Sequence, residues 1–470
     1  MPIVGLMWRT PPSLAVICAT ILVGASGCAS NRDYWDEDEI RPFFRITPPA
    51  VQPPRSEKPI VQAAFQEPKQ GEAFGSVLTS DDLVRRVLAQ NPTLDQMRAA
   101  AEAVAARYPQ VTSLDDPMFA FNTAPGSIGS PNADYAARVE LSQKFLYPGK
   151  RNLKGQVATA EAAAATRDID DTRLSLVAAA KSALADYYLA EKGASVAQEN
   201  LKLLREFHQN AETRYKTGVG PQQDVLQADV ELARQEERLI ALRRAKQVAI
   251  ARINTLMHAA PDAPLPPPEE LKSTATAPDA AHARGIAIQS RPDLKAATDR
   301  LMADEAALAL AKKEYNPDVE VLTAYDGFWQ GEGGRPLQWQ VGARVNLPVR
   351  QARRNGAVGE AQSKVAQRRA ELAKLTDRIN FEVQEAVEQV REAEDVVRVY
   401  EAKILPAADA NVKEAQTGYV NNKVPFLNLI EAQRNRVGLR DRYFETIAET
   451  VRRRASLERA IGSPGVQQTR

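Results

Sequence analysis

Two short segments of the chain alternate between apolar and polar side chains, which is the pattern of a half-buried strand. They cover residues 138–145 and 337–347, and residues 119–123 and 319–325 are two shorter, less regular candidates. Such alternation gives a strand one apolar face and one polar face. In a soluble sheet the apolar face packs on a core, whereas in a membrane barrel it meets lipid and the polar face lines a channel. Periodicity alone leaves both interpretations open.

Aromatic residues lie in or beside these segments, as an interfacial girdle would require. The residues concerned are Tyr135, Tyr147, Tyr325, Phe328, Trp329 and Trp339. Four strands cannot close a barrel, and an open sheet edge cannot lie in lipid. The membrane interpretation therefore predicts that several chains combine, and three copies would give twelve strands, an even number within the known range. The soluble interpretation predicts nothing about assembly.

Between the strands the chain favours helices that are too long for a compact domain. Residues 156–192, 222–260 and 360–405 contain neither glycine nor proline. Adding residues 194–217 gives one helical stretch of about 60 residues, which would be roughly 90 Å long. Gly193 and Pro406 predict an irregularity partway along each long helix.

Part of this helical sequence also has the spacing of a coiled-coil seam. The seam residues are Val225, Ala228, Leu232, Leu239 and Leu242. A simple soluble coiled-coil rod is the alternative, and the strand segments argue against it.

The same order of features occurs twice along the chain. Residues 91–94 (NPTL) open a helical pattern, and residues 291–294 (RPDL) open another 200 positions later. Each pattern runs to a Tyr-Pro or Tyr-Asn-Pro motif, which is followed by two strand segments and two long helices. Residues 215–228 pair with residues 419–432, at an offset of 204. A tandem duplication explains this order most economically.

The N-terminal residues resemble a bacterial lipoprotein signal. Arg9 gives a positive start, and residues 13–23 form an apolar stretch too short to span a bilayer. Small residues at 25–27 then lead into Cys28, which would carry lipid after cleavage and add membrane anchoring. An ordinary cleaved signal, with Cys28 incidental, is the alternative.

These patterns together divide the chain into five segments. Prolines between residues 31 and 75 are dense enough to prevent helices and ladders, so this part is expected to be a tether. We expect a signal peptide over 1–27, a Pro-rich tether over 28–75, a first repeat over 76–275, a second repeat over 276–462 and a tail over 463–470.

Composition excludes several classes of protein. The chain of 470 residues has 61 basic and 60 acidic side chains, a net charge of +1, which argues against nucleic acid as a partner. Its two cysteines and three histidines lack the spacing of a disulfide scaffold or a zinc site. The chain has one long apolar segment, near the N-terminus, which excludes a membrane protein with several transmembrane helices. Without a nucleophile elbow, a metal cluster or a phosphate loop, we expect no enzyme and no cofactor.

Several motifs resemble those of the outer-membrane factor family, the TolC-like outer membrane efflux proteins. Their order, duplication and spacing over residues 78–462 carry the resemblance, and they are residues 141–151 (LSQKFLYPGKR), 214–231 (RYKTGVGPQQDVLQADVE), 291–297 (RPDLKAA), 314–318 (EYNPD), 404–406 (ILP) and 428–434 (NLIEAQR). The turn at residues 147–150 is similar to that of family members that export heavy metals. A tight turn after a strand, however, needs only its proline and glycine.

The resemblance implies a mainly α protein with a small β part. Three tandem-repeat protomers would form a 12-stranded β-barrel in the outer membrane, continued by a 12-helix α-barrel across the periplasm. It implies a homotrimeric channel that catalyses no reaction and passively conducts substrates in a tripartite efflux system. Its partners would be a periplasmic adaptor (membrane fusion protein) and an inner-membrane transporter of the resistance-nodulation-division type. The outer-membrane channel of a type I secretion system and a periplasmic adaptor lipoprotein are the alternatives.

The resemblance also implies where the channel is gated. In the family two acidic residues, three apart, ring the constriction, and the matching positions are Asn428 and Glu431. Three copies of Glu431 would form one ring of like charges that favours bound cations. Asp224 is the equivalent of Asn428 in the first repeat. A solvated glutamate on a helix surface is the alternative interpretation of Glu431.

Adaptor tips in this family contact the two interhelical turns. Thr217, Gly218 and Val219 fit the small-Gly-apolar pattern of such a turn, whereas the second turn, with Asn422 and Lys423, departs from it. The glycine alone is also what a helix C-cap with positive φ requires.

Overall fold

The computed structural model describes most of the chain beyond its N-terminal segment. The chain divides into two units, 1–64 and 65–470, and only the second contains described residues. Cys28, the expected signal peptide and nearly all of the tether lie outside them, as do Tyr135, Phe328 and Trp329. The described residues are 75–127, 137–271, 277–327 and 339–463.

The elements follow the predicted order twice. The first series is α4 (Ser80–Gln90), α5 (Pro92–Ala105), α6 (Arg107–Thr112), β1 (Met118–Thr123), the short helix η1 (Pro125–Ser127), β2 (Ala137–Phe145), α7 (Lys150–Lys216) and α8 (Gln222–Leu256). The second is α9 (Ala280–Ser290), α10 (Pro292–Lys313), β3 (Val319–Gly327), β4 (Trp339–Val345), α11 (Gln351–Val399), η2 (Tyr400–Ile404), α12 (Leu405–Val420) and α13 (Phe426–Ile461). Both strand pairs and both long helical hairpins are confirmed.

Equivalent residues of the two repeats make equivalent contacts. Asn91 caps α5 by accepting from the Thr93 N–H, and its amide donates to the carbonyl of Leu256 at the end of α8, at 2.9 Å. Arg291, at the same place before α10, donates to the carbonyl of Ala460 at the end of α13, at 3.2 Å. In both repeats one side chain therefore ties the start of one helix to the end of the hairpin.

Helix α7 is one uninterrupted helix, so the predicted irregularity at Gly193 is wrong. It has 67 residues, which corresponds to about 100 Å. Gly193 is buried where α8 passes, and a Cβ there would lie 3.0 Å from Leu242 Cδ2. The glycine admits a close approach of two helices, and contacts along the rest of α7 outweigh its helix penalty of about 1 kcal/mol.

The predicted irregularity at Pro406 is confirmed. A π-helical turn, η2, precedes it, and Pro406 lies in the first turn of α12. Proline lacks an N–H and its ring clashes with the carbonyl four residues earlier, so the wider turn accommodates it.

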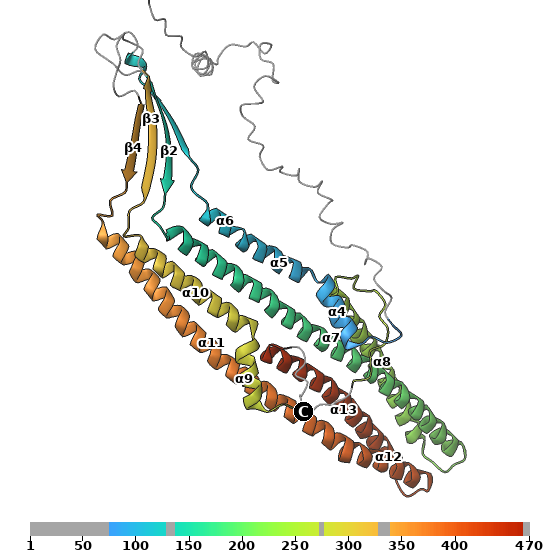
Figure 1. Ribbon diagram of the computed structural model, residues 1–470. Helices are drawn as coiled ribbons and strands as arrows, with labels where there is room; N and C mark the ends of the chain where they lie inside the picture. The colour runs from blue at the N-terminus through green and yellow to red at the C-terminus, as the bar shows by residue number, and fades with distance from the viewer. Residues whose placement is uncertain (1–74, 128–136, 272–276, 328–338, 464–470) are drawn as a thin grey trace, which may run out of the picture. The chain divides into compact units, whose positions relative to one another are not determined.

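The four strands form one antiparallel sheet in the order β1-β2-β3-β4 (Figure 1). Val139 pairs with Phe121 on one side and with Tyr325 on the other, and Tyr325 pairs with Trp339. Strands β1 and β4 are therefore the two edges of the sheet. Strand β2 leads directly into α7, and strand β4 leads directly into α11. The turns that join α7 to α8 and α12 to α13 lie at the other end of the helices, far from the sheet (Figure 1).

Two apolar cores hold the short helices against the long ones. Helix α4 packs through Leu83 and Val87 on Ala183 and Leu184 of α7 and on Ile253 of α8. Helix α9 packs in the same way on α11 and α13. Among the described residues, none of the helices has the length and apolar character needed to cross a membrane.

Candidate functional site

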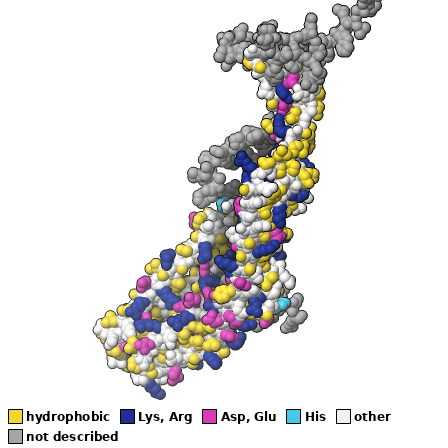
Figure 2. Space-filling view, turned by 90° about the vertical axis from the view of Figure 1, so that its left-hand side faces the viewer, with side chains coloured by type: hydrophobic (Ala, Val, Ile, Leu, Met, Phe, Trp, Pro, Cys, Tyr) yellow, Lys and Arg dark blue, Asp and Glu magenta, His cyan; other side chains and the backbone are white. Residues whose placement is uncertain are grey.

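One face of the sheet is apolar and exposed. It carries Phe119 and Phe121 of β1, Val139, Leu141 and Phe145 of β2, Val319, Val321 and Tyr325 of β3, and Trp339, Val341 and Val345 of β4, and each of these side chains is at least a third exposed. In Figure 2 hydrophobic side chains make up much of the visible surface around the strands. No described helix packs on this face, so the sheet does not use it to cover a protein core.

The opposite face is polar, and its charges pair with one another. Arg138 lies 3.7 Å from both Glu140 and Asp326, and the Gln340 amide donates to Asp326 at 2.6 Å. Arg344 bridges Glu320 at 2.9 Å and Glu140 at 3.3 Å. A soluble sheet would instead turn its apolar face to a core, because exposing contiguous apolar surface costs roughly 25 cal/mol per Å². This sheet has the distribution of a membrane strand, apolar on the outside and polar on the other side.

The second candidate region is the pair of turns at the far end of the helices, and their backbones match. Gly218 has φ +75° and Asn422 has φ +59°, at the repeat offset of 204. The carbonyl of Arg214 accepts from the N–H groups of Val219 and Gly220, and the carbonyl of Gly418 accepts from Lys423 and Val424. Asn422 therefore takes the role of glycine, as asparagine can in the left-handed region.

The side chains of these turns differ although their backbones agree. The first presents exposed Val219 after Thr217, whose hydroxyl donates to the Thr213 carbonyl at 3.0 Å. The second presents exposed Asn422 and Lys423. One turn therefore offers an apolar tip and the other a polar, basic one.

Contacts that the sequence did not predict join the two hairpins near these turns. The guanidinium of Arg214 lies 4.7 Å from the ring centre of Tyr419 and donates to the Tyr419 carbonyl at 3.2 Å and to Asn422. The Tyr419 hydroxyl donates to Asp224 at 3.2 Å. Burial, together with the charge of Asp224, raises the pKa of Tyr419 to about 12. We call these four residues, Arg214, Asp224, Tyr419 and Asn422, the tip cluster.

The predicted constriction residues lie in different surroundings. Asn428 and Glu431 are exposed on α13, one turn apart, whereas Asp224 is half-buried and bonded to Tyr419. Tyr419 is the repeat equivalent of Tyr215, so the duplication was a signal that could have drawn attention to it. The structure thus brings Asp224 into the tip cluster and leaves Asn428 and Glu431 on a free surface of the single chain.

A second connection between the hairpins lies farther from the turns. Glu231 of α8 is buried and accepts hydrogen bonds from Arg434 of α13, at 3.0 Å for Nε, and from Arg234. The hydrogen bond from Arg434 lowers the pKa of Glu231 against the opposing effect of burial. Glu231 and Arg434 are the last residues of two motifs of the family resemblance, 214–231 and 428–434, but the motifs did not predict that the two residues pair.

A buried amide layer adjoins this ion pair. Asn200 of α7 donates to Gln235 of α8 at 3.1 Å and accepts from Gln433 of α13 at 2.7 Å, and all three side chains are buried. Buried polar layers of this kind specify the register of packed helices at a cost in stability.

Helix α8 carries a further apolar stripe that is largely exposed. Leu226, Val230, Ile240 and Val248 are each at least half exposed and recur on one side of α8, away from its buried Ala228. In the hairpin region the helices follow the order α8, α7, α13, α12, and side chains of α8 also reach α12 and α13 through Asp224 and Glu231.

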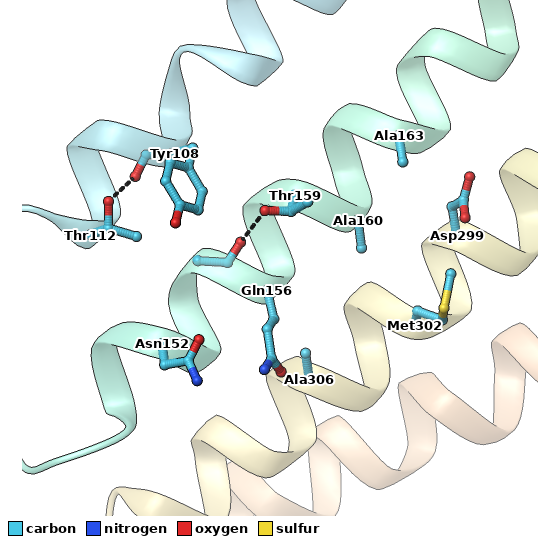
Figure 3. A pocket seen from close by; sticks show the side chains of 11 residues that line it. Tyr108, Thr112, Asn152, Gln156, Thr159, Ala160, Ala163, Asp299, Met302 and Ala306 are labelled. Atoms are coloured by element: carbon cyan, nitrogen blue, oxygen red, sulfur yellow. Dashed lines mark hydrogen bonds between the residues drawn. The ribbon is translucent and has the colours of Figure 1, made fainter.

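A cleft of about 450 Å³ lies between α6, α7 and α10 (Figure 3). Gly155 lets α6 approach α7, since a Cβ there would lie 2.9 Å from Thr112 Cγ2. Tyr108, Met302 and small residues such as Ala160 line it, and Asp299 lies at one end (Figure 3). Within the described residues no group of acidic, histidine or cysteine side chains has the arrangement of a metal site.

Comparison with known proteins finds one matching family model and several solved structures of similar fold. The model of the family "Outer membrane efflux protein" matches residues 83–258. None of the curated proteins matches the sequence.

Solved structures match over most of the chain. The outer-membrane channel OprN is 20% identical with a TM-score of 0.70, over 82% of this chain and 90% of that chain. CusC, described in connection with folding and transmembrane channel formation, is 15% identical with a TM-score of 0.71, over 85% of this chain and 99% of that chain. VceC of Vibrio cholerae is 18% identical with a TM-score of 0.69, over 82% and 96%. At these identities the likeness shows a shared fold.

Proposed function

Because the chain is recognised as an outer-membrane factor by its family match over residues 83–258 and by its fold, we propose that it is an outer-membrane efflux channel. It conducts substrates passively and catalyses no reaction. The observation that carries the proposal is the two-faced sheet, with exposed aromatic and branched side chains on one side and paired charges on the other.

The channel wall is built from three copies of this chain. Within the described residues no further strand pairs with the outer side of β1 or of β4, and open sheet edges are not tolerated in lipid. Pairing β4 of one copy with β1 of the next satisfies them, and three copies give a closed barrel of twelve strands. The exposed stripe of α8 supports the same closure, because it can pack on helix α12 of the next copy, where Ala407 and Ala410 are exposed.

Conduction is gated at the periplasmic helix tips. In a symmetric trimer Glu431 forms a ring of three carboxylates, and Asn428 forms a neutral ring one turn away. The tip cluster and the Glu231–Arg434 pair hold the α12–α13 hairpin against α7 and α8. We propose that these contacts keep the tips closed and that their loss lets the second hairpin move.

The resemblance to the family supports the partners that we propose. The turns at Thr217–Val219 and at Asn422 and Lys423 are the adaptor-contact sites, with an apolar tip on one and a basic tip on the other. The adaptor connects the channel to an inner-membrane transporter of the resistance-nodulation-division type, which selects the substrate. The protein lies in the outer membrane of a Gram-negative-type envelope, extends into the periplasm and carries a lipid on Cys28.

Conductance in planar bilayers tests this function. The purified protein should require detergent and form discrete channels, and Glu431→Ala should raise their conductance or weaken block by divalent cations. Asn428→Ala is the matched control, since it removes no charge one turn away. Absence of channels would reject the function, whereas channels that are indifferent to Glu431→Ala would reject only the gate.

A further inference from the structure

Two motifs that resemble the family, residues 147–150 and 314–318, meet where the sheet joins the helices. Lys150 is 1% exposed, and its ammonium group lies 2.9 Å from Asp318 Oδ1, 3.0 Å from the Asn316 carbonyl and 3.6 Å from Glu314. A tight turn after a strand needs the proline and the glycine of the first motif, but it does not need a buried lysine. Lys150 therefore requires an explanation of its own.

Asp318 connects Lys150 to the ends of three strands. Its Oδ1 also accepts from the N–H of Tyr147, just after β2, at 2.9 Å. Asp318 lies just before β3, and Asn346 lies just after β4. The N–H of Asp318 donates to the side-chain oxygen of Asn346 at 2.7 Å, and the N–H of Asn346 donates to the carbonyl of Asp318 at 3.3 Å. We call Tyr147, Lys150, Asp318 and Asn346 the strand–helix joint.

The second repeat does not reproduce the joint. The position equivalent to Lys150, at an offset of 200, is Arg350, which is exposed. Each chain therefore has one joint, at the first turn of α7. Gly149, beside Lys150, has φ +89° and leaves room for Lys313, whose ammonium group donates to the Pro148 carbonyl at 3.1 Å.

We propose that Lys150 is a positioning residue that holds the strand ends onto α7, so that the sheet and the helix layer continue as one wall of the conduit. The inference rests on the proposed channel. Its physical basis is that a buried ammonium without its carboxylate is strongly unfavourable, so any rotation of the sheet against α7 meets a steep cost. The joint thus acts on the shape of the pore as well as on stability.

The test compares purified full-length Lys150→Met, Asp318→Asn, the double variant Lys150→Met/Asp318→Asn and the control Lys295→Met, which removes an exposed lysine of α10. Lys150→Met should lower the temperature at which the trimer dissociates by roughly 10 °C. Its channels should also show several conductance levels, whereas we expect the wild type to show one. The double variant leaves no unpaired buried charge, so it should dissociate closer to the wild-type temperature and still show several levels.

Each outcome decides one point. A purely structural role would lower the dissociation temperature and leave the conductance of assembled channels unchanged, and that result would overturn the proposal. Strictly additive effects of the two substitutions would also overturn it, because they would mean that Lys150 and Asp318 do not act as a pair. If Lys150→Met does not assemble, the double variant carries the conductance measurement. A wild type that forms no channels would refute the proposed function and not the joint.

Discussion

Neighbouring residues of β1 provide a sharp test of the two-faced sheet. Phe119 is 65% exposed on the apolar face and pairs with Leu141, whereas exposed Ala120 lies on the polar face and pairs with Glu140. Lysine at position 119 would place a charge in the lipid, and lysine at position 120 would place the same charge opposite a carboxylate. The two variants differ by one position in the same strand.

The magnitude follows from the environment of each face. A lysine on the lipid face of a membrane strand costs about 2–4 kcal/mol near the bilayer centre, which lowers the ratio of folded to unfolded protein roughly 30- to 1,000-fold. Ala120→Lys should change the free energy of folding by a few tenths of a kcal/mol, because the new ammonium can pair with Glu140. In a water-exposed sheet Phe119→Lys would be nearly neutral or would improve solubility.

Refolding from urea into lipid vesicles measures the difference. The folded fraction is followed by the gel shift of unheated samples at several urea concentrations, with wild type and Ala120→Lys beside Phe119→Lys. We expect the midpoint of Phe119→Lys alone to fall sharply. Equal insertion of the two lysine variants, or a larger defect for Ala120→Lys, would refute the assignment of the faces.

Three further predictions concern the helix tips. Burial raises the pKa of Tyr419 from 10.0 to about 12, so the closed tip should be fully stable below pH 10 and should loosen as pH rises from 10 towards 12. Channels of the Tyr419→Phe variant should open more often at pH 7, which recordings of single-channel open time measure. The hydrogen bond from Arg434 lowers the pKa of Glu231 below 4.5, so the stability that this ion pair contributes is present above pH 4.5 and is lost as pH falls through the pKa of the folded protein. Glu231→Gln should therefore weaken the dependence of the melting temperature on acid pH. An acid dependence equal to that of the wild type would contradict this prediction. Asn422→Val should lower the free energy of unfolding by about 1–2 kcal/mol, because a β-branched residue resists positive φ. The control Asn421→Val, at a residue with φ −86°, should lower it less. Equal melting temperatures of the two variants would count against the turn geometry.

Much of the fold could be predicted from local pattern. Alternation located all four strands, because period two survives in any sheet, and the absence of glycine and proline located α7, α8 and α11. The repeat offset correctly related Gly218 to Asn422, although the residue types differ. These features can be predicted because they are patterns along one sequence and do not depend on which helices lie side by side.

The rest depends on which helices lie side by side, and sequence spacing does not report this. Gly193 looked like a break because its partner Leu242 lies on another helix. The sequence suggested no role for Lys150 beyond its turn, because the carboxylate that it pairs with is 168 residues away. The link from Tyr419 to Asp224 spans 195 residues for the same reason.

The mass of the detergent-solubilised protein tests the central claim most directly. The account predicts that the particle purified from membranes contains three copies of the chain and loses its folded state when detergent is removed. A monodisperse monomer that stays folded in water without detergent would contradict it, because the exposed apolar face and both open sheet edges would then need neither lipid nor a second copy.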